Sequence, residues 1–182
     1  MIPTTALLAL MFTLTPIALA AQDPHDEAQR HVRATDPLML RLIREGQQRS
    51  ATFRALIERL EQSDVIVYLE CGGRSAPPGG RLTFISAAAG LRYVQVHVAR
   101  LTYLDQQLAI IGHELRHAVE VADAPEVVDD ASLAREYTRI GYVNPRVLTG
   151  IAFDSDAAVK AGYQVLREIT DGQGVLRLAR GD

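Results

Sequence analysis

Apolar residues recur with a helical period in the first part of the chain. Asp36 and Pro37 are residue types favoured at the N-cap and first position of a helix, and leucines and an isoleucine follow them. Gly46 is expected to interrupt this helix, and Ser50 or Thr52 to cap a second one. The apolar residues of the second helix are spaced i, i+3, i+4 and i+7, which predicts one buried face made of Phe53, Leu56, Ile57 and Leu60.

Three stretches after these helices have the composition of β-strands. Residues 65–69 are mostly β-branched and apolar and indicate a buried strand, and residues 81–86 indicate a second one. In residues 92–99 valines alternate with polar or aromatic residues, which predicts one packed face and one open face. Residues 87–90 suit a tight connection, so we expect the second and third strands to form an antiparallel hairpin.

Helices are predicted again in the second half of the chain. The longest spans residues 102–121, where Thr102 and Asp105 have the spacing of a capping box. Its apolar stripe would pack against the sheet and consists of Leu104, Leu108, Ile111, Leu115 and Val119. Shorter helices are predicted over residues 132–140 and about 155–169.

The chain divides into three segments by charge and periodicity. Residues 1–20 have no charged side chain and end on the small-x-small pattern Ala18-Leu19-Ala20, which predicts a signal peptide and a secreted or periplasmic protein. The alternative is a retained membrane anchor, although the apolar run is short and interrupted. Residues 21–35 are polar without periodicity and are expected to form a flexible leader. Residues 36–182 are expected to form a single α+β domain, with a small antiparallel sheet packed on helices.

The overall composition excludes some classes of function. The chain has 182 residues, 48% of them hydrophobic, and 19 basic against 22 acidic side chains give a net charge of −3. Without a basic excess to neutralise phosphates, we expect no nucleic-acid partner, and no transmembrane segment once the signal peptide is removed. The single cysteine, Cys71, cannot form an internal disulfide, so the fold must depend on packing.

Candidate chemistry is concentrated in His113, Glu114 and His117, which form a His-Glu-x-x-His pattern on the predicted helix 102–121. Positions i and i+4 lie one turn apart, so both imidazoles can reach one metal ion. Glu114 is rotated about 100° from His113 and would lie beside the metal, where it can take a proton from the attacking water and pass it to a leaving amine. Zinc suits two imidazoles and one carboxylate with a fourth position left open. The alternative is a polar helix stripe that faces water or a partner, with incidental histidines.

The residues around this pattern resemble a known class of enzymes. Residues 111–119, Ile-Gly-His-Glu-Leu-Arg-His-Ala-Val, resemble the active-site helix of zincin metallopeptidases, and in particular that of the thermolysin-type gluzincins and minigluzincins. Residues 50–162 are also similar to an uncharacterised group of exported bacterial proteins with a His-Glu-Leu-x-His-Ala-x-Glu helix. The resemblance implies a zincin-like fold and zinc-dependent hydrolysis of a peptide or protein substrate, with His113 and His117 as ligands and Glu114 as general base.

The resemblance also implies a third ligand, which in gluzincins is a glutamate on a following helix. Glu136 lies 19 residues after His117 on a predicted helix and is the first candidate. Glu120 shares the face of the histidines, but a straight helix carries it one turn beyond the metal, where it is better placed to orient a ligand. Asp154 or Asp156 would give an aspartate-ligated site, whereas Asp154 is equally well suited to be the N-cap of the last helix.

One further interpretation of the function stays open at this stage. A zincin fold that holds metal without cleaving would be a metal-binding or protein-binding module. His97, on the polar side of its strand, could line a cleft, but a solvated histidine on an edge strand is the simpler interpretation. Three tyrosines could stabilise an oxyanion, although a tyrosine on an amphipathic element usually packs with its hydroxyl at the surface: Tyr137, Tyr142 and Tyr163.

Overall fold

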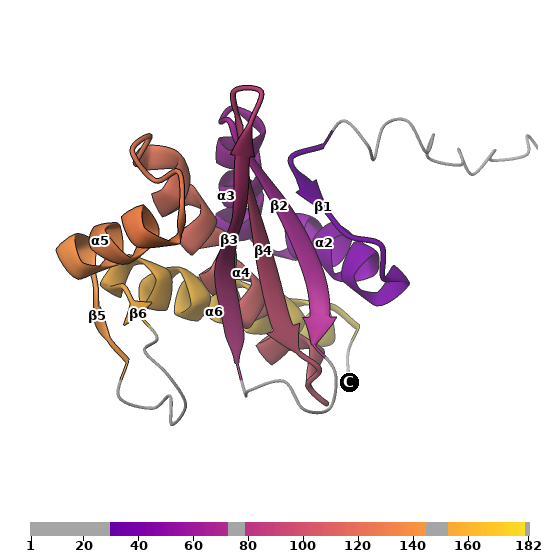
Figure 1. The fold of residues 1–182 in the computed structure, drawn as a ribbon. Coiled ribbons are helices and arrows are strands. Elements are labelled where there is room, and N and C mark those ends of the chain that lie inside the picture. Colours follow the sequence, from indigo (N-terminus) through magenta and orange to yellow (C-terminus); the bar gives the residue numbers. More distant parts are fainter. Residues whose placement is uncertain (1–29, 73–78, 145–152, 181–182) are drawn as a thin grey trace, which may run out of the picture.

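The computed structural model describes residues 30–72, 79–144 and 153–180. Over these residues the chain has an α+β fold with five helices and a mixed four-stranded sheet packed on helices (Figure 1). The predicted signal peptide, residues 1–20, lies outside the described residues. Within the described ranges no helix combines the length and the apolar character needed to cross a membrane.

The four-stranded sheet has the order β1-β2-β4-β3. Its strands are β1 (Val32–Arg33), β2 (Val65–Gly72), β3 (Gly80–Ala88) and β4 (Leu91–Ala99). The predicted hairpin is confirmed, because β3 pairs with β4 antiparallel. The expectation of an antiparallel sheet is wrong for the other pairs, since β1, β2 and β4 run parallel. The hairpin places β3 at the sheet edge and returns β4 beside β2, a choice that strand patterns do not encode. β1 also shows that the end of the predicted flexible leader belongs to the sheet.

Two helices precede the sheet's central strands, α2 (Pro37–Arg49) and α3 (Ala51–Glu61). As predicted, Asp36 caps α2, and Ser50 caps α3 by accepting a hydrogen bond from the backbone of Phe53. Gly46 does not interrupt α2 but lies inside it, where a Cβ would come within 2.8 Å of the Phe53 ring. The glycine therefore allows the two helices to pack closely.

The second half of the chain forms three helices, α4 (Leu104–Asp123), α5 (Asp130–Ile140) and α6 (Asp156–Arg180), and a short hairpin, β5 (Tyr142–Val143) and β6 (Phe153–Asp154). α4 begins without the predicted capping box: its N-cap is Tyr103, which makes no side-chain cap bond, and Asp105 instead pairs with Arg49 at 3.0 Å. α6 continues well beyond the predicted end at residue 169.

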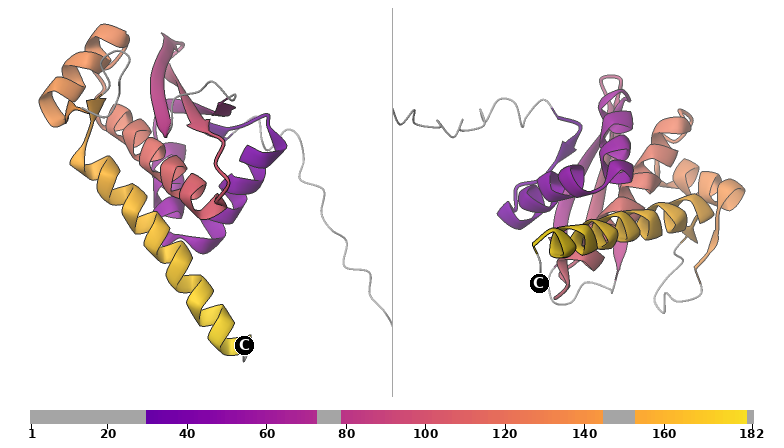
Figure 2. Two further views of the ribbon diagram at one scale, coloured as in Figure 1. Left: turned by 90° about the horizontal axis from the view of Figure 1, so that it is seen from below. Right: turned by 180° about the vertical axis from the view of Figure 1, so that it is seen from behind.

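Helices α2, α3, α4 and α6 lie on one side of the sheet, and α5 lies beyond the edge formed by β3 (Figures 1 and 2). The apolar side chains between the sheet and the helices form the core. The predicted stripe of α4 is buried there, apart from Leu104, which is partly exposed. α4 and α6 lie side by side (Figure 2). They approach closely because Gly112 and Gly162 have no side chain at the contact. A Cβ on Gly112 would lie 2.7 Å from Val165, and one on Gly162 would lie 3.2 Å from the backbone of Ala109. This close contact accounts for a glycine directly before His113.

Arg92 in β4 anchors the C-terminal end of α4. Its buried guanidinium donates to both carboxylate oxygens of Asp64 at 2.7 Å. It also donates to the carbonyl oxygens of Val121 at 2.7 Å and Ala124 at 2.6 Å. The last carbonyls of a helix lack their regular helical partners, so Arg92 adds to the backbone N–H groups that these two oxygens accept, from Ala124 and Val127, and ties α4 to the sheet.

Candidate metal centre

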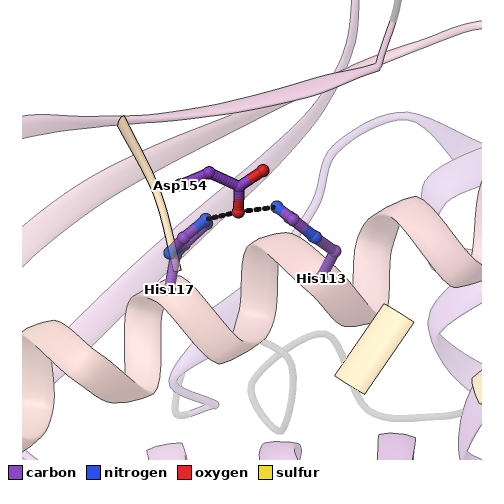
Figure 3. A group of neighbouring side chains, drawn as sticks. All are labelled: His113, His117 and Asp154. Carbon is purple, nitrogen blue, oxygen red and sulfur yellow. Dashed lines mark ion pairs between the residues drawn. The ribbon is translucent and has the colours of Figure 1, made fainter. Parts of the chain in front are cut away.

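Three potential ligand atoms converge between α4 and β6 (Figure 3). His113 and His117 extend from successive turns of α4, and the carboxylate of Asp154 lies above both rings. One carboxylate oxygen, Oδ1, is 3.4 Å from Nε2 of His113 and 3.7 Å from Nε2 of His117. The ligand atoms of the three residues all lie within 4.8 Å of one another. The structure thus forms a mostly buried group that could hold a metal ion.

The spacing of these atoms can be compared with the requirements of a small divalent cation. Imidazole nitrogens and carboxylate oxygens bound tetrahedrally to zinc lie about 2.1 Å from the metal, and hence about 3.4 Å from each other. The two histidine–aspartate separations, 3.4 and 3.7 Å, are close to this value, and the ligand atoms of all three residues lie within 4.8 Å of one another. Two histidines and one aspartate also leave a tetrahedral position open, so the donor set fits a metal centre with room for a reactant.

Each histidine has a second partner that fixes its ring. Nδ1 of His117 lies 2.8 Å from a carboxylate oxygen of Glu120, which leaves Nε2 directed at Asp154. His113 is hydrogen-bonded to the backbone of Ala158 at the start of α6. Such partners hold metal-binding imidazoles in the required tautomer and orientation. Glu120 therefore has the orienting position that its place on the helix predicts.

Ser155 connects Glu120 to the next element. Its hydroxyl donates to Glu120 at 2.6 Å and accepts the backbone N–H of Ala158 at 3.0 Å, so it is the N-cap of α6. The adjacent residue, Asp154, is therefore not the N-cap of α6, which was the alternative role that its sequence position suggested. Its Oδ1 accepts the backbone N–H of Ser155 at 2.8 Å and still faces the two histidines.

The electrostatics around His117 favour a positive charge. Burial by itself lowers the pKa of His117, but hydrogen bonds to Asp154 and Glu120 outweigh it and raise the pKa to about 9. The pKa of His113 is lowered, first by burial and then by its proximity to His117. Two neighbouring carboxylates thus stabilise a cation at His117, and they would stabilise a metal ion at the same place.

Glu114 is buried between α4 and the beginning of β3. A Cβ on Gly80 would lie 2.5 Å from its carboxylate oxygen Oε1, so this part of β3 passes directly over the acid. Burial raises the pKa of Glu114 to about 7, and the charge of Asp154 contributes in the same direction. His117 and a hydrogen bond from the backbone of Leu82 oppose this rise. Glu114 is therefore held next to the histidine group in a poorly solvated position.

The candidates for the third ligand differ in where the structure places them. Asp154 joins the histidines, whereas Glu136, the first candidate from the resemblance, is outside this group. Its carboxylate is instead paired with Arg139 on the same helix, at 2.8 Å from Nε. Glu120 orients His117, and Asp156 is exposed in the first turn of α6. The group therefore forms with an aspartate from β6 instead of a glutamate from α5.

The remaining residues from the sequence lie in different environments. His97 is on the helix-free face of the sheet, 3.7 Å from Glu70 on the neighbouring strand. Tyr137 is buried with its ring edge against His117 and its hydroxyl 3.4 Å from the His117 carbonyl, so it packs beneath the group. Tyr163 is 70% exposed on α6. Tyr142 is exposed and lies directly opposite Asp154 in the β5–β6 pair.

Sequence reasoning missed the side chains and backbone groups that support the ligands. Ser155 had a usable signal, because serine directly before a helical stretch is a common N-cap. Gly80 had none, and neither had Asn144, whose side-chain amide donates to Oδ2 of Asp154 at 3.2 Å, since both contacts join segments that meet only in the folded chain. Comparisons with models of known protein families, with curated proteins and with solved structures found no match. A function for this chain is consequently inferred from its own residues.

Proposed function

We propose that this chain is an exported, zinc-dependent peptidase of the zincin type. The observation that carries the proposal is the convergence of His113, His117 and Asp154 at separations close to those of a tetrahedral zinc site, with Glu114 buried alongside. The His-Glu-x-x-His spacing on one helix supports it. The uncharged segment 1–20 supports export.

The chain's residues have distinct parts in the proposed reaction. His113, His117 and Asp154 would hold the ion, and Glu120 keeps Nε2 of His117 free for it. Zinc, when bound, would polarise the scissile carbonyl and lower the pKa of a water molecule. Glu114 accepts the proton of the attacking water at its carboxylate and delivers it to the leaving amine. Its burial beneath β3 excludes bulk water that would otherwise exchange this proton.

The free edge of β3 favours an extended peptide as the substrate. β3 is the last strand of its sheet, and no described strand pairs with its outer edge, where the backbone of Leu82 donates a hydrogen bond to Glu114. Extended peptides bind such edges through main-chain hydrogen bonds. Because Gly80 at the start of β3 lies against Glu114, a peptide added along this edge would pass beside the proposed general base.

Metal content and one substitution test the proposal together. The purified protein should contain one zinc per chain by elemental analysis, and should cleave members of a fluorogenic peptide library. Glu114→Gln should retain the zinc and lose hydrolysis by a factor of at least about 10². Glu58→Gln, on the exposed face of α3, is the matched control and should leave both unchanged.

Each outcome has a definite meaning for the proposal. The zinc assignment would be overturned if the purified protein lacked stoichiometric zinc, or if it contained iron in place of zinc. Hydrolysis that survives Glu114→Gln would remove Glu114 from the mechanism. Zinc binding without hydrolysis by the native chain would refute the peptidase and favour the metal-binding module that the sequence also allows.

A further inference from the structure

Two of the three proposed ligands share a rigid helix, but the third comes from a separate element. His113 and His117 are fixed relative to each other by α4. Asp154 belongs to β6, which is only two residues long and pairs with β5. The distance from Asp154 to the histidines therefore depends on how the β5–β6 hairpin is seated against α5 and α4.

Gly141 is where the hairpin meets the end of α5. It is the C-cap of α5, and its N–H donates to the carbonyl oxygen of Tyr137 at 3.0 Å. A Cβ at this position would overlap the carbonyl oxygen of Asp154 and would lie 3.0 Å from that of Tyr137. Both obstacles are backbone atoms, which cannot rotate away as a side chain would. Any side chain larger than hydrogen must therefore displace the backbone of Asp154.

Asn144 acts on the carboxylate of the same residue. Its side-chain amide donates to Oδ2 of Asp154 at 3.2 Å, from the end of β5. The other oxygen, Oδ1, accepts the backbone N–H of Ser155 at 2.8 Å and faces both Nε2 atoms. With one donor on each oxygen, the rotation of the carboxylate is restricted, and Oδ1 is the oxygen presented to the histidines.

We propose that Gly141 and Asn144 are positioning residues for the metal ligand Asp154: Gly141 sets the position of its backbone, and Asn144 sets the orientation of its carboxylate. The inference rests on the proposed metal centre. Neither residue belongs to the group of three ligands, so each is expected to affect the metal through its contact with Asp154. Partners that orient ligating groups typically contribute 10–100-fold to metal affinity. A loss of this size is expected when either residue is replaced.

The experiment compares Gly141→Ala and Asn144→Ala with Gly172→Ala. The control adds the same methyl group at a glycine of α6 where a Cβ would meet no atom within 4 Å. Zinc affinity is measured by competition with a chromophoric chelator on the full chain. Cobalt-substituted protein then reports ligand geometry through its visible absorption spectrum. Both test variants should bind zinc about 10–100-fold more weakly and show an altered cobalt spectrum, while the control matches the native protein.

The two variants fail in different ways, which keeps the inference testable. Circular dichroism establishes that each variant is folded; if Gly141→Ala is not, Asn144→Ala decides, because it removes a donor without introducing a collision. Native affinity and an unchanged cobalt spectrum in a folded variant would overturn the positioning role while leaving the metal centre intact. A native chain that binds no metal would instead overturn the proposed function, and this inference with it.

Discussion

Replacement of Arg92 by methionine should destabilise the fold more than any ordinary surface substitution. Methionine keeps much of the buried volume but removes every donor. The carboxylate of Asp64 is 42% exposed and can be hydrated again, so its loss costs little. The carbonyls of Val121 and Ala124 are buried and keep a backbone donor each, from Ala124 and Val127, but each would lose its bond to the charged Arg92, which contributes about 1.5–3 kcal/mol. The two lost bonds together give an expected loss of about 4 kcal/mol.

Urea denaturation followed by circular dichroism measures this loss as a change in the free energy of unfolding. Arg59→Met is the matched control, because Arg59 pairs with Asp123, also at the end of α4, with side chains that are 42% and 48% exposed. An exposed pair of this kind contributes at most about 1 kcal/mol. A loss below about 1 kcal/mol for Arg92→Met, or equal losses for both variants, would refute the anchoring role of Arg92.

Two further predictions concern Gly80 and Glu168. Gly80→Ala should push the Glu114 carboxylate out of place and lower kcat on a cleaved peptide about 10²-fold with zinc content unchanged; native turnover would contradict this. Burial opposes the ionisation of Glu168, but hydrogen bonds from Ser50, Gln164 and Thr52 lower its pKa from 4.5 to about 2. Because the folded pKa is depressed, its contribution to stability is complete above pH 4.5 and is lost as the pH falls toward 2. Urea titrations between pH 2 and 7 should show this loss in the native chain and not in Glu168→Gln; identical pH profiles would disprove it.

The sequence alone was sufficient for most elements of regular structure. Helical spacing predicted the buried faces of α3 and α4, alternation predicted β4, and the short connection at residues 87–90 predicted its hairpin with β3. These features follow from interactions between residues close together in the chain. The predicted capping box of Thr102 and Asp105 was wrong because a distant side chain competed with a local contact: Asp105 pairs with Arg49 at the start of α4.

The candidate site divides in the same way. His113, Glu114 and His117 could be selected from sequence, because one helical turn fixes their relative positions without reference to the rest of the chain. Asp154 lies 37 residues after His117, and 22 acidic residues compete for the role of third ligand. Spacing alone cannot rank carboxylates over such a distance.

The sequence by itself therefore determined helix α4 and the placement of His113 and His117 one turn apart on it, since both features depend on local periodicity. The tertiary structure decided the rest: the insertion of β4 beside β2, the burial of Glu114 beneath β3, and the arrival of Asp154 above the histidines. Asp154 reaches its place because Ser155 caps α6 and Gly141 lets the hairpin lie against α5. These are steric and hydrogen-bonding contacts between segments far apart in the chain, and they exist only once the chain has packed.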